Sequence, residues 1–143
     1  LGGWISDKLG GSIVTQWVSV VMVGASAAVG YVMMLAYQSP NPEQYFFAFM
    51  TLFIVLFAAT GVGNGSTFRS VGFIFDRQQA GPVLGWTSAV AGYGAFIAPV
   101  LIGAEIKAGT PQLAMYGFSA FYAVCLVVNW WFYLRAGAEI KNP

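Results

Sequence analysis

The chain has 143 residues, of which 58% are hydrophobic, 17% aromatic and only 8% charged. A soluble domain carries about 25% charged residues, so this chain has too little polar material to coat a water-facing surface and is expected to lie in lipid. The net charge of +1 gives no basic face for a nucleic acid, and the lack of histidine together with a single cysteine excludes an internal disulfide, a His/Cys metal site and histidine-based catalysis.

The chain opens with a loop pattern. Its start reads GGWISDKLGG, in which Gly3, Asp7, Lys8 and Gly10 fit G-x-x-x-D-[RK]-x-G. Gly3 permits close approach of helices, Gly10 permits a tight turn, and the Asp7 carboxylate can face the N-terminus of a neighbouring helix, which carries about +0.5 of a charge. The alternative is a solvated loop with an ordinary ion pair.

Four apolar runs follow, each long enough to cross about 30 Å of hydrocarbon as a helix rising 1.5 Å per residue. One such run fits a buried helix of a soluble protein, but four in succession predict an all-α membrane protein. The opening is no signal peptide and looks like the tail of a helix already under way, in the C-terminal part of a longer protein. The expected segments are a helix end at 1–6, helices at 12–37, 45–75, 83–106 and 112–135, and a tail at 136–143.

Prolines mark the breaks between these runs. Residues 39–44, SPNPEQ, separate the first two runs, and Pro82 is expected in the first turn of the third helix. Thr110 and Pro111 are suited to be the cap and the first residue of the fourth. Pro99 lies inside the third run, where a proline frees a backbone carbonyl and bends the helix.

The basic residues predict an orientation. If the opening loop is cytoplasmic, five of the six Lys and Arg residues lie at or toward the inner side, as the positive-inside rule requires. These five are Lys8, Arg69, Arg77, Arg135 and Lys141. The five tryptophans also fall near the inner ends of the helices. We therefore expect a multi-pass membrane protein with a cytoplasmic C-terminus.

Polar residues follow one face of the second run. Thr60, Asn64 and Thr67 lie at i, i+4 and i+7 and can donate hydrogen bonds to a ligand, although bonds to a neighbouring helix or to their own i−4 carbonyl are an equal alternative. Arg69 is the only arginine at appreciable membrane depth, which makes it a functional hypothesis. It lies roughly 140° around the helix from Asn64, at about 100° per residue. We favour a structural or inner-gate role for it, paired with Asp76 or with a partner outside the chain.

The third run contains the stretch GWTSAVAGYGAFIAP, which is rich in small residues. Spacings of three, four, three and four place a stripe of them on one helical face: Gly85, Ser88, Gly92, Ala95 and Pro99. The pairs Gly85 with Ala89 and Gly94 with Ala98 add small-xxx-small contacts on adjacent faces. In lipid, small residues let helices approach and slide, so the density of the pattern favours a moving helix over static packing.

Three stretches carry a family resemblance. GGWISDKLGG resembles the cytoplasmic loop motif of major facilitator superfamily transporters. GWTSAVAGYGAFIAP is similar to the glycine-rich signature in the eleventh helix of the NarK-type nitrate/nitrite porters, and GVGNGSTFRSVGFIF (61–75) resembles the end of that family's tenth helix. The resemblance covers essentially the whole chain. It implies the C-terminal fragment of a twelve-helix major facilitator fold, comprising the end of helix 8 and helices 9–12.

The resemblance implies secondary active transport of nitrate or nitrite across the inner (plasma) membrane by alternating access, with no cofactor. The implied partners are the anion, the bilayer and the missing N-terminal helices. Residues implied beside the substrate path are Ser88, Gly92, Asn64, Ser66 and Thr67. Those implied in helix packing are Gly85, Ala89, Gly94, Phe96 and Pro99, and those of the cytoplasmic loop latch are Gly3, Asp7, Lys8 and Gly10. The family's substrate-binding arginines are expected outside this chain.

Two other functions stay open. A major facilitator carrier for another solute would share the loop motif, and a non-transporting membrane anchor subunit would share the spans, although a haem-binding anchor would need histidines. No nucleophile with a base, exposed carboxylate pair or metal-ligand cluster indicates an enzyme. Cys125 is expected to be a buried thiol, and the Asn129 amide is expected to bond a backbone carbonyl.

Overall fold

The computed structural model describes residues 2–143, and every regular element in that range is helical. The elements are α1 (Gly2–Leu9), α2 (Gly11–Gln38), the short 3-10 turn η1 (Pro42–Tyr45), α3 (Phe46–Ile74), α4 (Arg77–Ala108), α5 (Pro111–Asn129) and the π-helical turn η2 (Trp130–Leu134). Four helical stretches are long and apolar enough to cross a membrane: Gly11–Gln38, Pro42–Ile74, Arg77–Ala108 and Pro111–Leu134. The predicted all-α fold with four long apolar helices is therefore confirmed.

Some helix ends differ from the predicted ones for local reasons. α1 continues to Leu9, because the Gly10 N–H still bonds the Ser6 carbonyl at 2.8 Å. α4 begins at Arg77 instead of near residue 83, because the Asp76 carbonyl already accepts the N–H of Ala80 at 2.8 Å. Pro82 consequently lies inside α4, past its first turn. α5 starts at the predicted place, with Pro111 as its first residue and Thr110 before it. The Thr110 hydroxyl makes no capping bond, however, because it donates to the Glu105 carboxylate at 2.7 Å.

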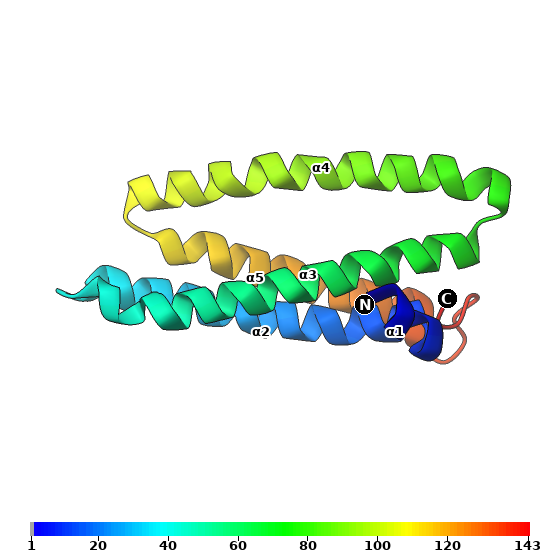
Figure 1. Cartoon of the computed structure of the whole chain (residues 1–143), viewed down its shortest axis with the longest axis horizontal. Coiled ribbons are helices and arrows are strands. Elements are labelled where there is room, and N and C mark those ends of the chain that lie inside the picture. The colour runs from blue at the N-terminus through cyan, green and yellow to red at the C-terminus, as the bar shows by residue number, and fades with distance from the viewer. Residues whose placement is uncertain (1) are drawn as a thin grey trace.

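α2 is the centre of the packed part of the fold and lies between α3 and α5 (Figure 1). Its buried face consists mainly of small residues, and six of the nine buried positions are Gly, Ser or Ala. They are Gly11, Ser12, Ser19, Ala25, Ser26 and Gly30. Small side chains let the helix backbones approach closely, which is the main source of helix association where burial of leucine gains little.

Hydrogen bonds join α2 to α5 along this contact. The Asn129 amide is buried and donates to the Ser12 carbonyl at 2.9 Å and to the Gln16 side-chain oxygen at 2.7 Å. The Ser119 hydroxyl donates to the Val23 carbonyl at 2.9 Å. The expected bond from Asn129 to a backbone carbonyl is confirmed. These bonds fix the register of the two helices.

α4 is packed differently from the other spans. None of its residues is buried, and the figure shows it running beside the bundle, joined to α3 and α5 by short turns at its two ends (Figure 1). The helix is continuous through Pro99. A large part of its surface is therefore left without a partner in this chain.

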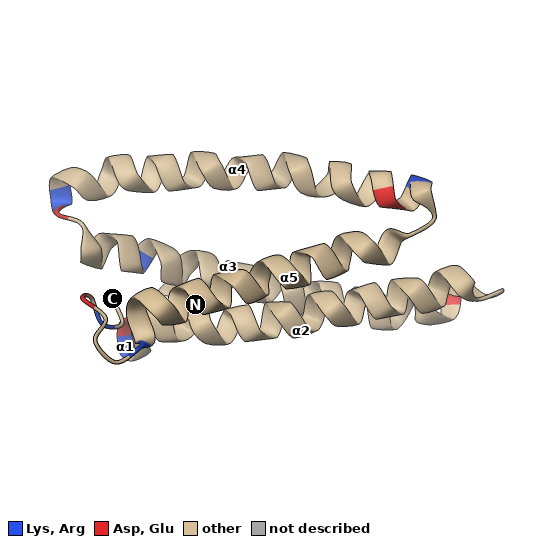
Figure 2. Cartoon of the chain, turned by 180° about the vertical axis from the view of Figure 1, so that it is seen from behind, with Lys and Arg blue, Asp and Glu red and all other residues tan. Residues whose placement is uncertain are grey.

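The charged residues gather toward the two ends of the bundle (Figure 2). The helices alternate in direction, so α1, the starts of α2 and α4, and the ends of α3 and α5 share one end with the C-terminal residues (Figure 1). Five of the six basic residues lie on these segments, and Lys107 lies at the opposite end. The five tryptophans, all exposed, lie at the same end as the five basic residues. We call this end the basic end.

The close contact of α2 with α5 depends on Gly30. A Cβ at this position would lie 2.8 Å from the Tyr116 ring and 3.3 Å from the Gln112 carbonyl oxygen. We expect Gly30→Val to destabilise the protein by about 1–3 kcal/mol, as overpacking does, and to lower the melting temperature of the purified protein in detergent. Gly24→Val is the matched control, because Gly24 lies on the same helix with nothing within 4 Å. Equal melting temperatures for the two variants would contradict the close contact.

Candidate functional site

At the basic end, an ion pair ties α1 to α3. The Arg69 Nε donates to Asp7 Oδ1 at 3.3 Å, and the Arg69 guanidinium lies 5.7 Å from the Phe73 ring centroid. The Asp7 side chain is 69% exposed and that of Arg69 25% exposed. An exposed pair of this kind contributes at most about 1 kcal/mol, so its main effect is to position α1 against α3. Sequence reasoning placed both residues at this end but did not pair them.

The rest of the loop pattern has mixed contacts. Gly10 has a φ of 92°, a conformation that suits glycine and agrees with the predicted tight turn. Lys8 is exposed, and its ammonium lies 4.1 Å from the centroid of the Trp4 ring. Gly3 has nothing within 4 Å of an added Cβ, so the close approach predicted for it is not made within this chain.

The hydroxyls predicted beside the substrate path on α3 are already bonded. The Thr67 hydroxyl donates to the Gly63 carbonyl at 2.9 Å, and the buried Ser66 hydroxyl lies 2.8 Å from the Thr15 hydroxyl of α2. Thr60 similarly bonds the Phe57 carbonyl at 2.8 Å. These hydroxyls therefore bond their own helix or a neighbouring one, which is the alternative to binding a ligand. Asn64 differs from them, since its side chain is exposed and has no hydrogen bond among the described residues.

The small-residue stripe of α4 points away from the rest of the chain. A groove of about 780 Å³ runs between α4 and α5. The α4 residues that line it include Val90, Gly94, Ile97 and Leu101. At about 100° per residue these lie on the opposite side of the helix from Gly92. All members of the stripe are exposed: Gly85, Ser88, Gly92, Ala95 and Pro99. Ala89 and Phe96 are exposed as well.

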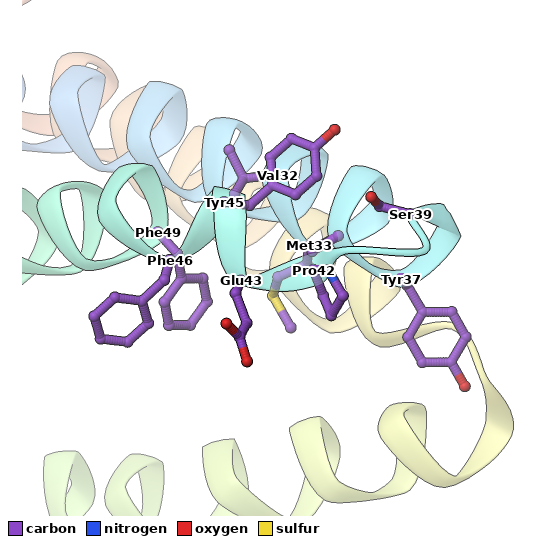
Figure 3. A pocket seen from close by; sticks show the side chains of 10 residues that line it. Val32, Met33, Tyr37, Ser39, Pro42, Glu43, Tyr45, Phe46 and Phe49 are labelled. Carbon is purple, nitrogen blue, oxygen red and sulfur yellow. The ribbon is translucent and has the colours of Figure 1, made fainter.

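Neither large groove is suited to an anion. The groove between α4 and α5 has Glu105 as its one charged residue among the described lining residues. A second groove, of about 870 Å³, lies at the end opposite the basic end, between α2, η1 and α3 (Figure 3). Its lining is apolar and aromatic except for Ser39, the tyrosine hydroxyls and Glu43. A lone carboxylate repels an anion, especially where water is scarce.

Cys125 is partly exposed on α5, so the prediction of a buried thiol is wrong. Among the described residues, no group of three or more His, Cys, Asp or Glu side chains could hold a metal ion.

Comparisons with known proteins find transporters of two related anions. The chain is 41% identical over 97% of its length to "Probable nitrate/nitrite antiporter NarK2" of Thermus thermophilus. It is 31% identical over 94% of its length to "Nitrate/nitrite transporter NarU" of Escherichia coli K12. It is 30% identical over 87% of its length to "Nitrite extrusion protein" of Bacillus subtilis 168.

These matches cover only part of the relatives. The chain spans 30% of the Thermus protein, 33% of the Escherichia protein and 28% of the Bacillus protein. No family model matches the chain. No solved structure matches it significantly.

The contact between Thr15 and Ser66 gives a test of how α2 and α3 pack. We expect the double-mutant cycle of Thr15→Val and Ser66→Ala to give a coupling free energy of about 0.6 kcal/mol, the usual value for a hydrogen bond between membrane helices. The measurement is equilibrium unfolding in mixed micelles. Thr15→Val combined with Thr60→Val is the control, because Thr60 bonds only its own helix and should show no coupling.

Proposed function

The chain belongs to the NarK-type nitrate/nitrite porters, and on that premise we propose that it forms part of a transporter that carries nitrate or nitrite across the inner membrane by alternating access. The 41% identity with the Thermus antiporter across 97% of the chain supports this proposal most strongly. In the complete protein, α1 is the end of helix 8 and α2, α3, α4 and α5 are helices 9 to 12. The basic end is placed in the cytoplasm, following the positive-inside rule.

The free face of α4 supports a place for this helix beside the substrate path. α4 has no buried residue, and its small-residue stripe faces away from α5. We infer that the missing N-terminal helices cover this face. The substrate path then runs between the N-terminal and C-terminal halves of the transporter. Glycines at such an interface allow the halves to approach and slide when the transporter changes state.

Among the residues implied beside the path, Ser88 and Asn64 are the strongest candidates for binding. Both are exposed, and neither makes a side-chain hydrogen bond among the described residues, so their donors are free for a ligand. Ser66 and Thr67 are already bonded within the bundle and are assigned to helix packing. Gly92 contributes space and not a contact.

The positive charge for the anion is assigned to residues outside this chain. A planar monoanion is bound best by a guanidinium that donates two parallel hydrogen bonds. Arg69 is tied to Asp7, which suits it to an inner gate and not to the anion. Because most of the Asp7 side chain is exposed, its carboxylate can bind the helix N-terminus of the other half in one state and release it in the next.

The proposal is tested by anion flux into proteoliposomes that contain the full-length parent protein. We expect saturable uptake of nitrate, and faster uptake when nitrite is loaded inside, since an exchanger returns to its starting state with a counter-anion bound. Vesicles without protein are the control. Well-folded protein that moves neither anion would favour a carrier for another solute, and a broad solute screen would follow.

The sliding interface is tested on α4. We expect Gly92→Leu to abolish nitrate uptake with normal expression, because the added side chain occupies the face proposed to meet the other half. Gly24→Leu is the matched control: Gly24 is also an exposed mid-helix glycine with nothing within 4 Å, but it is outside the proposed path. Normal uptake by Gly92→Leu would contradict the interface.

A further inference from the structure

The junction of α1 and α2 lacks a capping side chain of its own. Gly10 is the residue before α2 and offers none. The first hydrogen bond within α2 runs from the Val14 N–H to the Gly10 carbonyl at 3.3 Å. The N–H groups of Gly11, Ser12 and Ile13 therefore have no partner within the helix. A helix start in this position needs acceptors from elsewhere.

The C-terminal residues supply these acceptors. The Pro143 carbonyl accepts the Gly11 N–H at 2.6 Å, and the Asn142 Oδ1 accepts the Ile13 N–H at 3.0 Å. The Asn142 Nδ2 also donates to the Leu9 carbonyl at the end of α1, at 2.8 Å. The side-chain amide of Asn142 thus bonds both the end of α1 and the start of α2. Its sequence distance from these partners is 129 and 133 residues.

The C-terminal residues are themselves held in place. The Asn142 N–H donates to the Tyr133 carbonyl at 3.2 Å, which anchors the segment to the end of the last span. Pro143 is fully buried, and its carbonyl also accepts the Ser70 hydroxyl of α3 at 3.4 Å. Asn142 has a φ of 47°, a left-handed conformation that asparagine adopts more readily than most residues. The segment therefore bonds α1, α2, α3 and η2 where they meet at the basic end.

The two glycines of the loop make room for this contact. A Cβ at Gly10 would overlap the Asn142 side chain. A Cβ at Gly11 would lie 2.6 Å from the Pro143 carbonyl oxygen and would overlap the Ser70 hydroxyl. By contrast, Gly3 has nothing within 4 Å. Both glycines are thus required by the docked C-terminal residues, and Gly10 is required by the turn as well.

We propose that Asn142 and Pro143 form a clasp that caps α2 and fixes the angle between α1 and α2. Because α1 bears Asp7, Asn142 acts as a positioning residue for the Asp7–Arg69 pair. The opening loop (residues 2–11) then moves together with α3 and the end of α5 as one rigid body. The capping role is independent of transport, whereas the effect on the latch rests on the proposed function.

The clasp is tested by amide hydrogen exchange in the full-length parent protein. Asn142→Gly keeps the left-handed backbone and removes both side-chain bonds. We expect exchange of the Ile13 amide, whose acceptor is removed, to rise about tenfold, while the middle of α2 is unchanged. Lys141→Gly is the matched control, because it adds a glycine next to the clasp at an exposed side chain. Unchanged exchange at the Ile13 amide in Asn142→Gly would overturn the clasp.

A second variant and a second readout separate the two roles. Asn142→Asp keeps the acceptor for Ile13 but loses the donor to Leu9, so its exchange should fall between wild type and Asn142→Gly. In nitrate uptake, we expect Asn142→Gly to change the maximal rate by about threefold or more with an unchanged KM. Faster amide exchange in Asn142→Gly with an unchanged maximal rate of nitrate uptake would support the capping role of Asn142. It would overturn the proposed effect of Asn142 on the latch. If the wild-type protein moves no nitrate, the exchange experiment still decides the cap.

Discussion

Close packing of α2 against α3 and α5 is the contact on which the rest of this structure depends. In lipid, the apolar surface of a helix gains little from burial, so helices associate where their backbones come close and their polar groups pair. α2 meets both conditions, since small residues dominate its buried face. Its bonds to Asn129, Ser119 and Ser66 then fix the register of the neighbouring helices.

This packing explains why several polar residues on the α3 span do not form a site within the chain. Ser66 is used to join two helices, and Thr67 satisfies its hydroxyl on its own helix. Hydroxyls in a membrane span bond the nearest carbonyl unless a stronger partner is present. Asn64 and Ser88 remain exposed because they lie on faces that α2 and α5 do not reach. The faces of α3 and α4 that have no partner in this chain are therefore the ones suited to a site between two halves of a protein.

The basic end shows how a small number of polar contacts organises a loop. The Asp7–Arg69 pair contributes little free energy at its exposure, but it connects α1 with α3. The bonds made by Asn142 and Pro143 are partly buried and satisfy backbone groups that would otherwise have no partner. A backbone N–H without a partner costs more than an exposed ion pair contributes. Consequently the shape of this end depends more on the C-terminal residues than on the charges of the loop motif.

The sequence by itself determined the all-α membrane fold, the four spans, the start of α5 at Thr110 and Pro111, and the gathering of basic residues at one end. These features follow from hydropathy, proline chemistry and charge, which act within one turn or one span. Only the tertiary structure decided that Arg69 pairs with Asp7, that Ser66 faces α2, that α4 stands apart and that Asn142 caps a helix 129 residues away. The physical reason is that lipid-facing and helix-facing sides of a span are equally apolar, so hydropathy cannot tell which face finds a partner.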